Sequence, residues 1–590
     1  MKLSLCNFHI LRCLKALFAF LLFISSFSLS AQFYSGMQLD FGKNRLQYNF
    51  FFVFYFLLSD FFWTFYRYEK YDVYFYLGGK ELAGFTSEYA AKYLKEIESK
   101  LEYETDDKMQ IIIYNKLSDF KQSNIGYINN ESYNTGGLTR ISGNKVFLYF
   151  NGSYADFQKQ IRAGITEIVF NQMMFGSSIT AQMKNNIIFN LPDWYSKGLI
   201  SYMSENWNTD LDNILKDGFS VGKFQKFNSL TGNDAINAGH SFWRFIAEKY
   251  GEKNIPPIIY MTRVSRNIET GFQYVLGMSF KDIISDWIMY YSVKYRENDD
   301  NKMPENGTFL KRQKASRIYQ HLCSSSDGNH MAYVTNELGQ YKVWIYNSEK
   351  RKAKRIMKSG FKLDEKADLS YPLLSWHPSG EILAVITEKK GLNYLYLYNL
   401  NERKFEKILL QYFSRILDFS YSPNGQLIVM SAIQNGQSDI FVYNMSFFSS
   451  EQITIVFYDD DYPRFINKGK QIIFSSNRNS DTLRFGENTV KEFNSNKDLF
   501  IFDYNPRKSL LRRVTKTPNI NEIYPMEYDN ASISFISNEN GINNRYIATF
   551  DSVISHIDTA IHYRYITNYY PVSNYNRNII IIQYKINVME

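Results

Sequence analysis

Residues 422–444 read SPNGQLIVMSAIQNGQSDIFVYN, and this stretch contains the unit that decides the fold of the second half of the chain. A turn with a glycine precedes an apolar strand, and a second strand follows a short polar link. In the second strand Phe441 and Tyr443 alternate with Ile440 and Val442, which is the two-residue period of an extended strand. The unit therefore predicts two antiparallel strands whose apolar faces need to be covered.

Similar units recur along the second half of the chain. They begin at Ser325, His377, Ser422 and Asn467, and weaker copies begin at Tyr528 and Asn574. A spacing of about 45 to 60 residues is the range of β-propeller blades, and such blades must stack because none buries its faces alone. We therefore expect an all-β propeller of about six blades over residues 308–590. Either the first strands after the preceding linker complete the last blade, or the propeller is truncated at its C-terminal end.

The first half of the chain has a different pattern. Residues 33–295 begin with predicted strands at 71–82, 108–116 and 144–152, and contain predicted helices at 86–103 and 154–176. Thr86 or Ser87 is expected to cap the first helix. Strands followed by amphipathic helices predict an α+β domain. The charged stretch RENDDNKMPENG at 296–307 predicts a linker between the two domains.

The N-terminal segment has the features of a secretory signal. Lys2, Arg12 and Lys15 flank or precede the apolar run ALFAFLLFISSFSLS, and small residues follow. We expect residues 1–31 to be cleaved between Ala31 and Gln32, with an uncleaved anchor as the alternative. The expected location is the periplasm or the outer membrane, after secretion across the inner membrane.

Removal of the signal would also remove Cys6 and Cys13, so Cys323 would have no internal disulfide partner. Three basic residues leave with the signal, so the formal net charge falls from +8 to about +5. This mild charge predicts no nucleic-acid partner. The aromatic run at 49–66 is interrupted by Ser59 and Asp60 and is too short to span a bilayer, so contact with a membrane is expected to be peripheral at most.

Two motifs in the first domain have the frame of a zinc peptidase site without its ligands. In gluzincins, a helix carries H-E-x-x-H, where two His bind zinc and the Glu is the general base. The stretch RAGITEIV at 162–169 matches that frame, but Ala163 and Glu167 stand at the His positions and Gly164 at the Glu position. The stretch DWYSKGLISY at 193–202 resembles the segment with the third ligand, but Lys197 replaces its Glu.

On these motifs, residues 65–295 resemble the peptidase-MA-like (gluzincin) domain that precedes TolB-like propellers in secreted Bacteroidetes proteins. The units SPNGQLIVMSA and GKQIIFSSNRNSD resemble the repeats of TolB-like and WD-like propellers. The resemblance implies a gluzincin-like fold but no peptidase activity, no bound metal and no cofactor. Glu167 and Lys197 could attract each other across the former cleft.

The remaining residues suggest no other reaction. The histidines after the signal segment are scattered and are expected at the surface or in turns; they are His240, His321, His330, His377, His556 and His562. No G-x-S-x-G elbow or P-loop is present. We therefore predict a non-catalytic binding or scaffold protein of the cell envelope with a protein partner. The alternatives are a divergent zinc metallopeptidase and a polysaccharide-binding propeller with a glycan partner.

Overall fold

The computed structural model describes most of the two predicted domains. The described residues are 63–122, 140–141, 144–176, 191–296, 317–362, 369–455, 457–481, 483, 496–508, 510–529, 532–557 and 561–579. The predicted signal segment at 1–31 and nearly all of the predicted linker at 296–307 lie outside them. Among the described residues, no helix is long and apolar enough to cross a bilayer.

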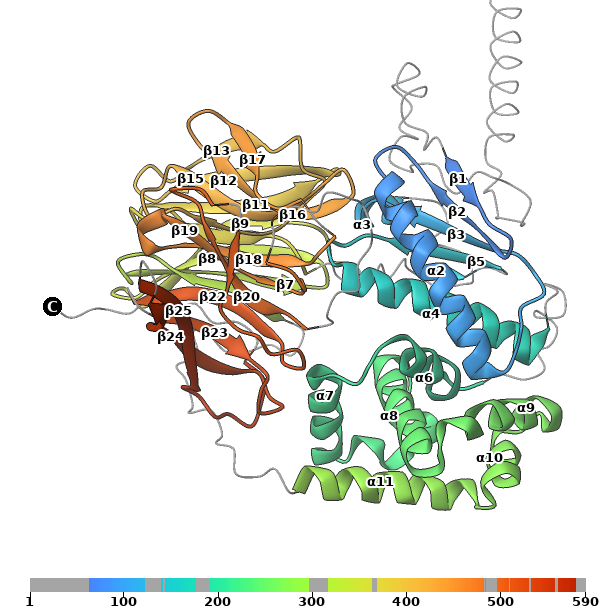
Figure 1. The fold of residues 1–590 in the computed structure, drawn as a ribbon. Helices are drawn as coiled ribbons and strands as arrows, with labels where there is room; N and C mark the ends of the chain where they lie inside the picture. Colours follow the sequence, from blue (N-terminus) through green and yellow to red (C-terminus); the bar gives the residue numbers. More distant parts are fainter. Residues whose placement is uncertain are drawn as a thin grey trace, which may run out of the picture.

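A mixed sheet forms one half of the N-terminal domain (Figure 1). Its strands, in spatial order, are β1 (Thr64–Arg67), β2 (Tyr71–Phe75), β3 (Met109–Tyr114), β5 (Lys145–Tyr149) and β4 (Arg140–Ile141). The central strands β2, β3 and β5 are parallel, and the two edge strands are antiparallel to their neighbours. Long connections between the parallel strands therefore carry helices over the faces of the sheet.

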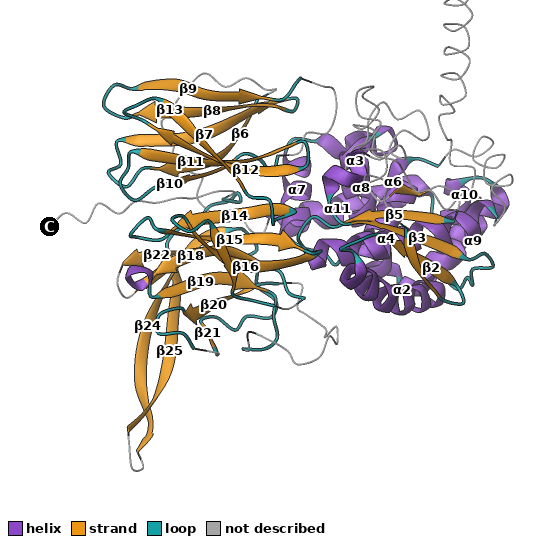
Figure 2. Ribbon diagram, turned by 90° about the horizontal axis from the view of Figure 1, so that it is seen from above, coloured by secondary structure: helices purple, strands orange, loops and turns teal. Residues whose placement is uncertain are grey.

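Helices α2 (Lys80–Leu101) and α4 (Tyr154–Phe175) cover one face of this sheet, and α3 (Leu117–Gln122) lies on the other (Figure 2). The predicted start of the first helix at Thr86 or Ser87 is wrong, because α2 begins six residues earlier. Both hydroxyls instead donate to carbonyl oxygens one turn back, those of Leu82 and Ala83. Such internal bonding lets these residues sit inside a helix.

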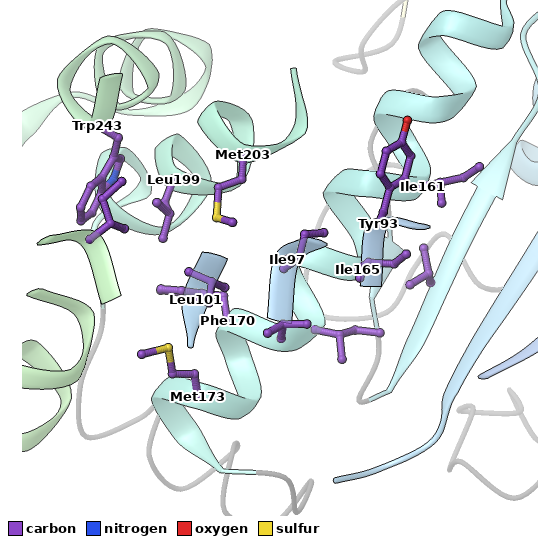
Figure 3. Close-up of a cluster of buried hydrophobic side chains, with 14 of the residues drawn as sticks. Tyr93, Ile97, Leu101, Ile161, Ile165, Phe170, Met173, Leu199, Met203 and Trp243 are labelled. Carbon is purple, nitrogen blue, oxygen red and sulfur yellow. The ribbon is translucent and has the colours of Figure 1, made fainter. Parts of the chain in front are cut away.

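The other half of the domain is helical. It contains α6 (Asp193–Ser204), α7 (Thr209–Ser220), η3 (Lys223–Ser229), α8 (Gly232–Tyr250), η4 (Glu252–Asn254), α9 (Ile255–Ser265), α10 (Ile268–Leu276) and α11 (Phe280–Arg296). Figure 3 shows Leu101 of α2, Phe170 of α4 and Leu199 of α6 turned toward one interior. The predicted α+β class of this domain is confirmed, and its two halves share one apolar core.

A close crossing of two glycines joins α6 to α8. A Cβ on Gly198 would lie 2.6 Å from the Cα of Gly239, and a Cβ on Gly239 would lie 2.0 Å from the carbonyl oxygen of Trp194. Both contacts are with backbone atoms, which cannot rotate away. The two helices can therefore approach this closely only because both positions lack a side chain.

We predict that Gly239→Ala destabilises the protein by about 1–3 kcal/mol or more, because the added methyl group forces α6 and α8 apart. Gly84→Ala in α2 is the matched control, because no atom lies within 4 Å of its added Cβ. The control should gain up to about 1 kcal/mol from helix propensity. Urea unfolding measures both, and equal free energies of unfolding for the two variants would contradict the close crossing.

Five four-stranded antiparallel sheets make up the described propeller. Blade 1 contains β6 (Ile318–Ser324), β7 (His330–Glu337), β8 (Gln340–Asn347) and β9 (Lys352–Ser359), and blade 2 contains β10 (Leu373–Trp376), β11 (Ile382–Lys389), β12 (Leu392–Asn399) and β13 (Lys404–Leu409). Blade 3 contains β14 (Arg415–Tyr421), β15 (Leu427–Gln434), β16 (Gln437–Asn444) and β17 (Ser449–Gln452), and blade 4 contains β18 (Asp460–Ile466), β19 (Gln471–Ser476), β20 (Asp498–Asp503) and β21 (Leu511–Arg513). Blade 5 contains β22 (Glu522–Asp529), β23 (Ser532–Ser537), β24 (Asn544–Ile557) and β25 (Ile561–Pro571).

The prediction of about six blades is wrong for the described residues, which form five. The stretch that begins at Asn574 does not start a blade there. Its amides bond to the turn between β23 and β24: Asn540 Nδ2 donates to Asn574 Oδ1, and the backbone N–H of Asn543 donates to Asn578 Oδ1. The polar residues that resemble a blade turn in the sequence therefore hold the end of blade 5.

Turn chemistry explains the repeat at the other blade starts. The hydroxyl of Ser422 accepts a hydrogen bond from the backbone N–H of Leu427, and Gly425 has a φ of 72°. Glycine tolerates that left-handed conformation, so the turn between the first and second strands needs it. At the end of the third strand, Asn444 Oδ1 accepts the backbone N–H groups of Ser446 and Phe447, which forms an Asx turn.

Candidate functional site

The positions predicted to replace the zinc ligands lie on two neighbouring helices. Ala163, Gly164 and Glu167 are on α4, and Lys197 is on α6. Gly164 is buried, Ala163 and Glu167 are half-buried, and Lys197 is exposed. Methyl and hydrogen side chains at 163 and 164 supply neither a ligand atom nor a base. No group of three or more His, Cys, Asp or Glu side chains in the described part of the chain is placed to hold a metal ion.

The residues that preserve the frame of the second motif are core residues. Trp194, Tyr195 and Leu199 are almost fully buried, and Gly198 makes the close crossing with α8. Trp243 Nε1 also donates to the carbonyl oxygen of Tyr195 at 3.0 Å. The residues that match the peptidase pattern are therefore those that packing requires. Lys197, at the position where the pattern expects a metal ligand, is exposed.

The predicted attraction between Glu167 and Lys197 has a competitor on the same helix. Lys197 Nζ lies 3.0 Å from Asp193 Oδ1, one turn earlier on α6. The lysine side chain is 57% exposed, so this pair resembles an ordinary surface pair of about 0.3–0.5 kcal/mol. Lys197 thus acts as a surface residue of α6.

The prediction that His240 lies at the surface or in a turn is wrong, because the residue lies inside α8 with almost no exposed area. Its Nδ1 is 3.0 Å from the hydroxyl of Ser201 on α6, and the Trp207 ring lies beside it. Burial lowers the pKa of His240 to about 3, so the ring is neutral at physiological pH. The apolar residues of SFWRFIAEKY recur at helical spacing, and this pattern was the signal in the sequence that one face of α8 is buried.

The propeller supplies a carboxylate to the start of α4. Asp459, directly before β18, accepts hydrogen bonds from the backbone N–H of Tyr154 at 2.5 Å, from that of Ala155 at 3.2 Å and from the hydroxyl of Ser153 at 2.8 Å. These N–H groups have no carbonyl partner within the helix. The negative charge also lies at the positive end of a 22-residue helix, where it is favourable.

An apolar contact surrounds this carboxylate. The Phe457 ring lies edge-on to that of Tyr154 at 5.5 Å, and it also contacts Phe85 of α2 at 6.3 Å. Leu417 and Ile433 of blade 3 approach Gly152 so closely that a Cβ there would lie within 3.2 Å of both. The core of the N-terminal domain therefore continues into the propeller without an intervening layer of water.

Further polar contacts join the two domains at the turns between second and third strands. Lys116 Nζ donates to the carbonyl oxygen of Gly391 at 3.1 Å, and Asn213 Nδ2 donates to that of Gly541 at 3.4 Å. Gly436 lies against the backbone of Gly78. Because strands in a blade alternate in direction, all these turns lie at one end of the propeller, and the N-terminal domain covers that end.

The segment around Asp459 is fixed by its neighbours in blade 4. The next residue, Asp460, pairs with Arg478 at 2.5 Å, and neither side chain has exposed area. The hydroxyl of Ser476 donates to the other oxygen of Asp460 at 2.6 Å. A buried ion pair with satisfied oxygens specifies one geometry, because losing either partner leaves an uncompensated charge. Contacts within blade 4 therefore fix the segment that carries the capping carboxylate, independently of α4.

Burial raises the pKa of Asp459 to about 6, and the charge of Lys497 opposes that rise. An exposed Asp titrates near 3.9, so the folded protein binds more protons than the unfolded chain between about pH 4 and 6. Stability from this group therefore falls as the pH rises through that window and is constant above it. The full span corresponds to about 3 kcal/mol.

We predict that Asp459→Asn removes this component of the pH dependence. Urea unfolding of the protein and of the variant at intervals between pH 4 and 7.5 measures it, because all other titrating groups are shared. The free energy of unfolding should fall more steeply with rising pH in the unaltered protein than in the variant. Equal slopes would show that Asp459 has an ordinary pKa and is not buried against α4.

Comparisons with known proteins find only distant similarity. No family model and no curated protein matches the chain. TolB from Acinetobacter baumannii has a TM-score of 0.31 and 16% identity, covering 39% of this chain and 52% of that protein, so the chain spans about half of its length. A putative TolB from Agrobacterium tumefaciens has a TM-score of 0.28 and 14% identity, covering 44% of this chain and 85% of that protein.

A prolyl endopeptidase structure has a TM-score of 0.30 and 8% identity, covering 40% of this chain and 34% of that protein. At these scores none of the similarities supports an argument about function. The β-propeller is established by its own five sheets and their register, and the resemblance of the first domain to gluzincins remains a prediction from the two motifs.

Proposed function

We propose that this chain is a non-catalytic binding protein of the cell envelope, in which an inactive peptidase-like domain and a propeller form one body that binds a protein partner. The observation that carries the proposal is the division within the two motifs. Frame residues such as Trp194 and Tyr195 are retained in the core, whereas Ala163, Gly164 and Lys197 lack the chemistry of the reaction. A chain with this combination of residues can keep the fold of the domain without the groups that catalysis needs.

The end of the propeller away from the N-terminal domain is the proposed partner-binding end. The turns between first and second strands and between third and fourth strands lie there. One of these turns carries two neighbouring exposed aromatic residues, Phe447 at 80% and Phe448 at 55%, and the next blade exposes Leu510. Exposed aromatic side chains on a rigid scaffold are typical anchors of protein interfaces.

The catalytic half of the proposal is tested by elemental analysis of the purified protein beside a peptide-cleavage assay. We expect substoichiometric zinc and no cleavage. The variant Ala163→His/Glu167→His/Lys197→Glu restores the three ligand types and leaves the buried Gly164 unchanged. If the frame is that of a gluzincin, this variant should bind about one zinc per chain. Stoichiometric zinc in the unaltered protein, with cleavage abolished by a chelator, would establish the divergent metallopeptidase instead.

The binding half is tested by affinity capture from a native envelope fraction. Phe447→Ser/Phe448→Ser should lose a captured protein that the unaltered chain retains. Tyr274→Ser is the control, because Tyr274 is 73% exposed on α10, in the other domain. Equal capture by both variants would place the interface elsewhere. Binding to a glycan array without any captured protein would favour the polysaccharide-binding alternative.

A further inference from the structure

The positive charge of this chain is concentrated in one blade. Residues 308–368, which contain blade 1 and the sequence on either side of it, carry thirteen basic and six acidic residues, a net charge of +7. The whole chain has a formal net charge of +8, so all the other residues together contribute only +1. Local charge rather than the total determines which surface attracts an anionic partner, and here that surface belongs to blade 1.

The outermost strand of blade 1 presents much of this charge to solvent. In the sheet, β9 follows β6, β7 and β8, and Figure 2 shows it at the outer rim of the propeller. The exposed basic side chains of this strand and of the turn before it form what we call the basic rim: Lys350, Arg351, Lys352, Lys354, Arg355 and Lys358.

The charges of the basic rim are not neutralised within the described chain. None of its six side chains forms an ion pair with another described residue. Lys358 lies directly opposite Lys342 of β8 in the register of the two strands. Like charges at such positions destabilise a sheet, so an anionic partner outside the chain would stabilise this one.

Basic residues on an edge strand also prevent different molecules from pairing edge to edge, which is the simpler explanation of their presence. That requirement is met with fewer charges elsewhere in this propeller, because the outermost strands β13, β17, β21 and β25 contain at most two Lys or Arg each. β9 contains four, and the turn before it adds two. Protection of an edge therefore does not account for the whole of the basic rim.

Two exposed apolar side chains lie at the C-terminal end of β9. Phe361 is 80% exposed and Leu338 is 48% exposed. Their segments are held together, because Gln340 Nε2 donates to the carbonyl oxygen of Gly360 at 3.1 Å. This corner of blade 1 therefore combines an aromatic and an aliphatic side chain with the charge of Lys358.

This combination fits a lipid surface better than an acidic polymer. A row of cations along one strand matches the planar negative surface of a bilayer, whereas recognition of single phosphate or carboxylate groups favours the planar fork of arginine. Four of the six residues in the basic rim are lysines, which act as point charges. An exposed aromatic side chain beside basic residues is typical of contact with the headgroup region.

We propose that the basic rim and Phe361 bind the surface of a bilayer that contains anionic lipids. The lysines and arginines lie over the headgroups, and Phe361 and Leu338 enter the interface beside them. The contact is peripheral and uses the side of blade 1. It is separate from the proposed protein partner at the end of the propeller and does not depend on it.

Vesicle sedimentation with the full chain tests the proposal. The chain should bind vesicles of phosphatidylcholine and phosphatidylglycerol, and this binding should weaken as the salt concentration rises. Vesicles of phosphatidylcholine alone isolate the electrostatic part, because attachment through the apolar residues 49–66 would not need lipid charge. Equal binding to the two kinds of vesicle would overturn the proposal.

Lys354→Glu/Lys358→Glu should lower the affinity for the anionic vesicles about tenfold or more, because each basic residue near such a surface contributes to binding. Gln at both positions should give a smaller loss and serves if the reversed charges disturb the strand. The matched control is Lys253→Glu/Arg263→Glu, which changes the net charge equally at exposed residues of the helical half. Equal losses in the two Glu variants would show that net charge alone governs binding and would overturn the proposal.

Phe361→Ser distinguishes a bilayer from a soluble polyanion. It should weaken binding to the anionic vesicles about threefold or more and leave any binding to dextran sulfate unchanged, because only a bilayer offers the ring an apolar layer. If dextran sulfate binds as tightly as the vesicles, and Phe361→Ser affects neither, the partner is an acidic polymer and the proposal is overturned.

Discussion

The carboxylate of Asp459 at the start of α4 is the contact on which the arrangement of the two domains depends. It accepts three donors from residues 153–155, which lie some three hundred positions earlier in the chain. A helix of 22 residues needs partners for its first N–H groups, and here the partner belongs to another domain. Since α4 also packs on the sheet and on α6, the cap positions the whole N-terminal domain on one end of the propeller.

This arrangement gives the peptidase-like frame a structural role that does not need a reaction. The helix with Ala163, Gly164 and Glu167 links the sheet, the helical half and the propeller, and the segment with Lys197 crosses α8 through Gly198 and Gly239. Packing alone therefore accounts for these elements, without any zinc ligand or reaction. At the other end of the propeller, Phe447 and Phe448 are exposed.

Local chemistry determined how much the sequence could predict. The repeat was readable because Ser422, Gly425 and Asn444 perform turn functions that only a few residue types can perform, so the propeller and the α+β class were both predicted. The same logic failed at Asn574, where a similar polar pattern holds the end of blade 5. It also failed at Thr86, whose hydroxyl bonds within the helix. The Asp459 cap has no local signature, because it depends on segments some three hundred positions apart in the chain.

Calorimetry tests most directly whether the two domains form one body. The account predicts that the protein unfolds in a single transition whose calorimetric and van't Hoff enthalpies agree. In Asp459→Ala, the N–H groups of Tyr154 and Ala155 lose their acceptor inside an apolar contact, at a cost of about 1–3 kcal/mol, and the transition should separate into two. Two independent transitions in the unaltered protein, unchanged by the substitution, would contradict the account.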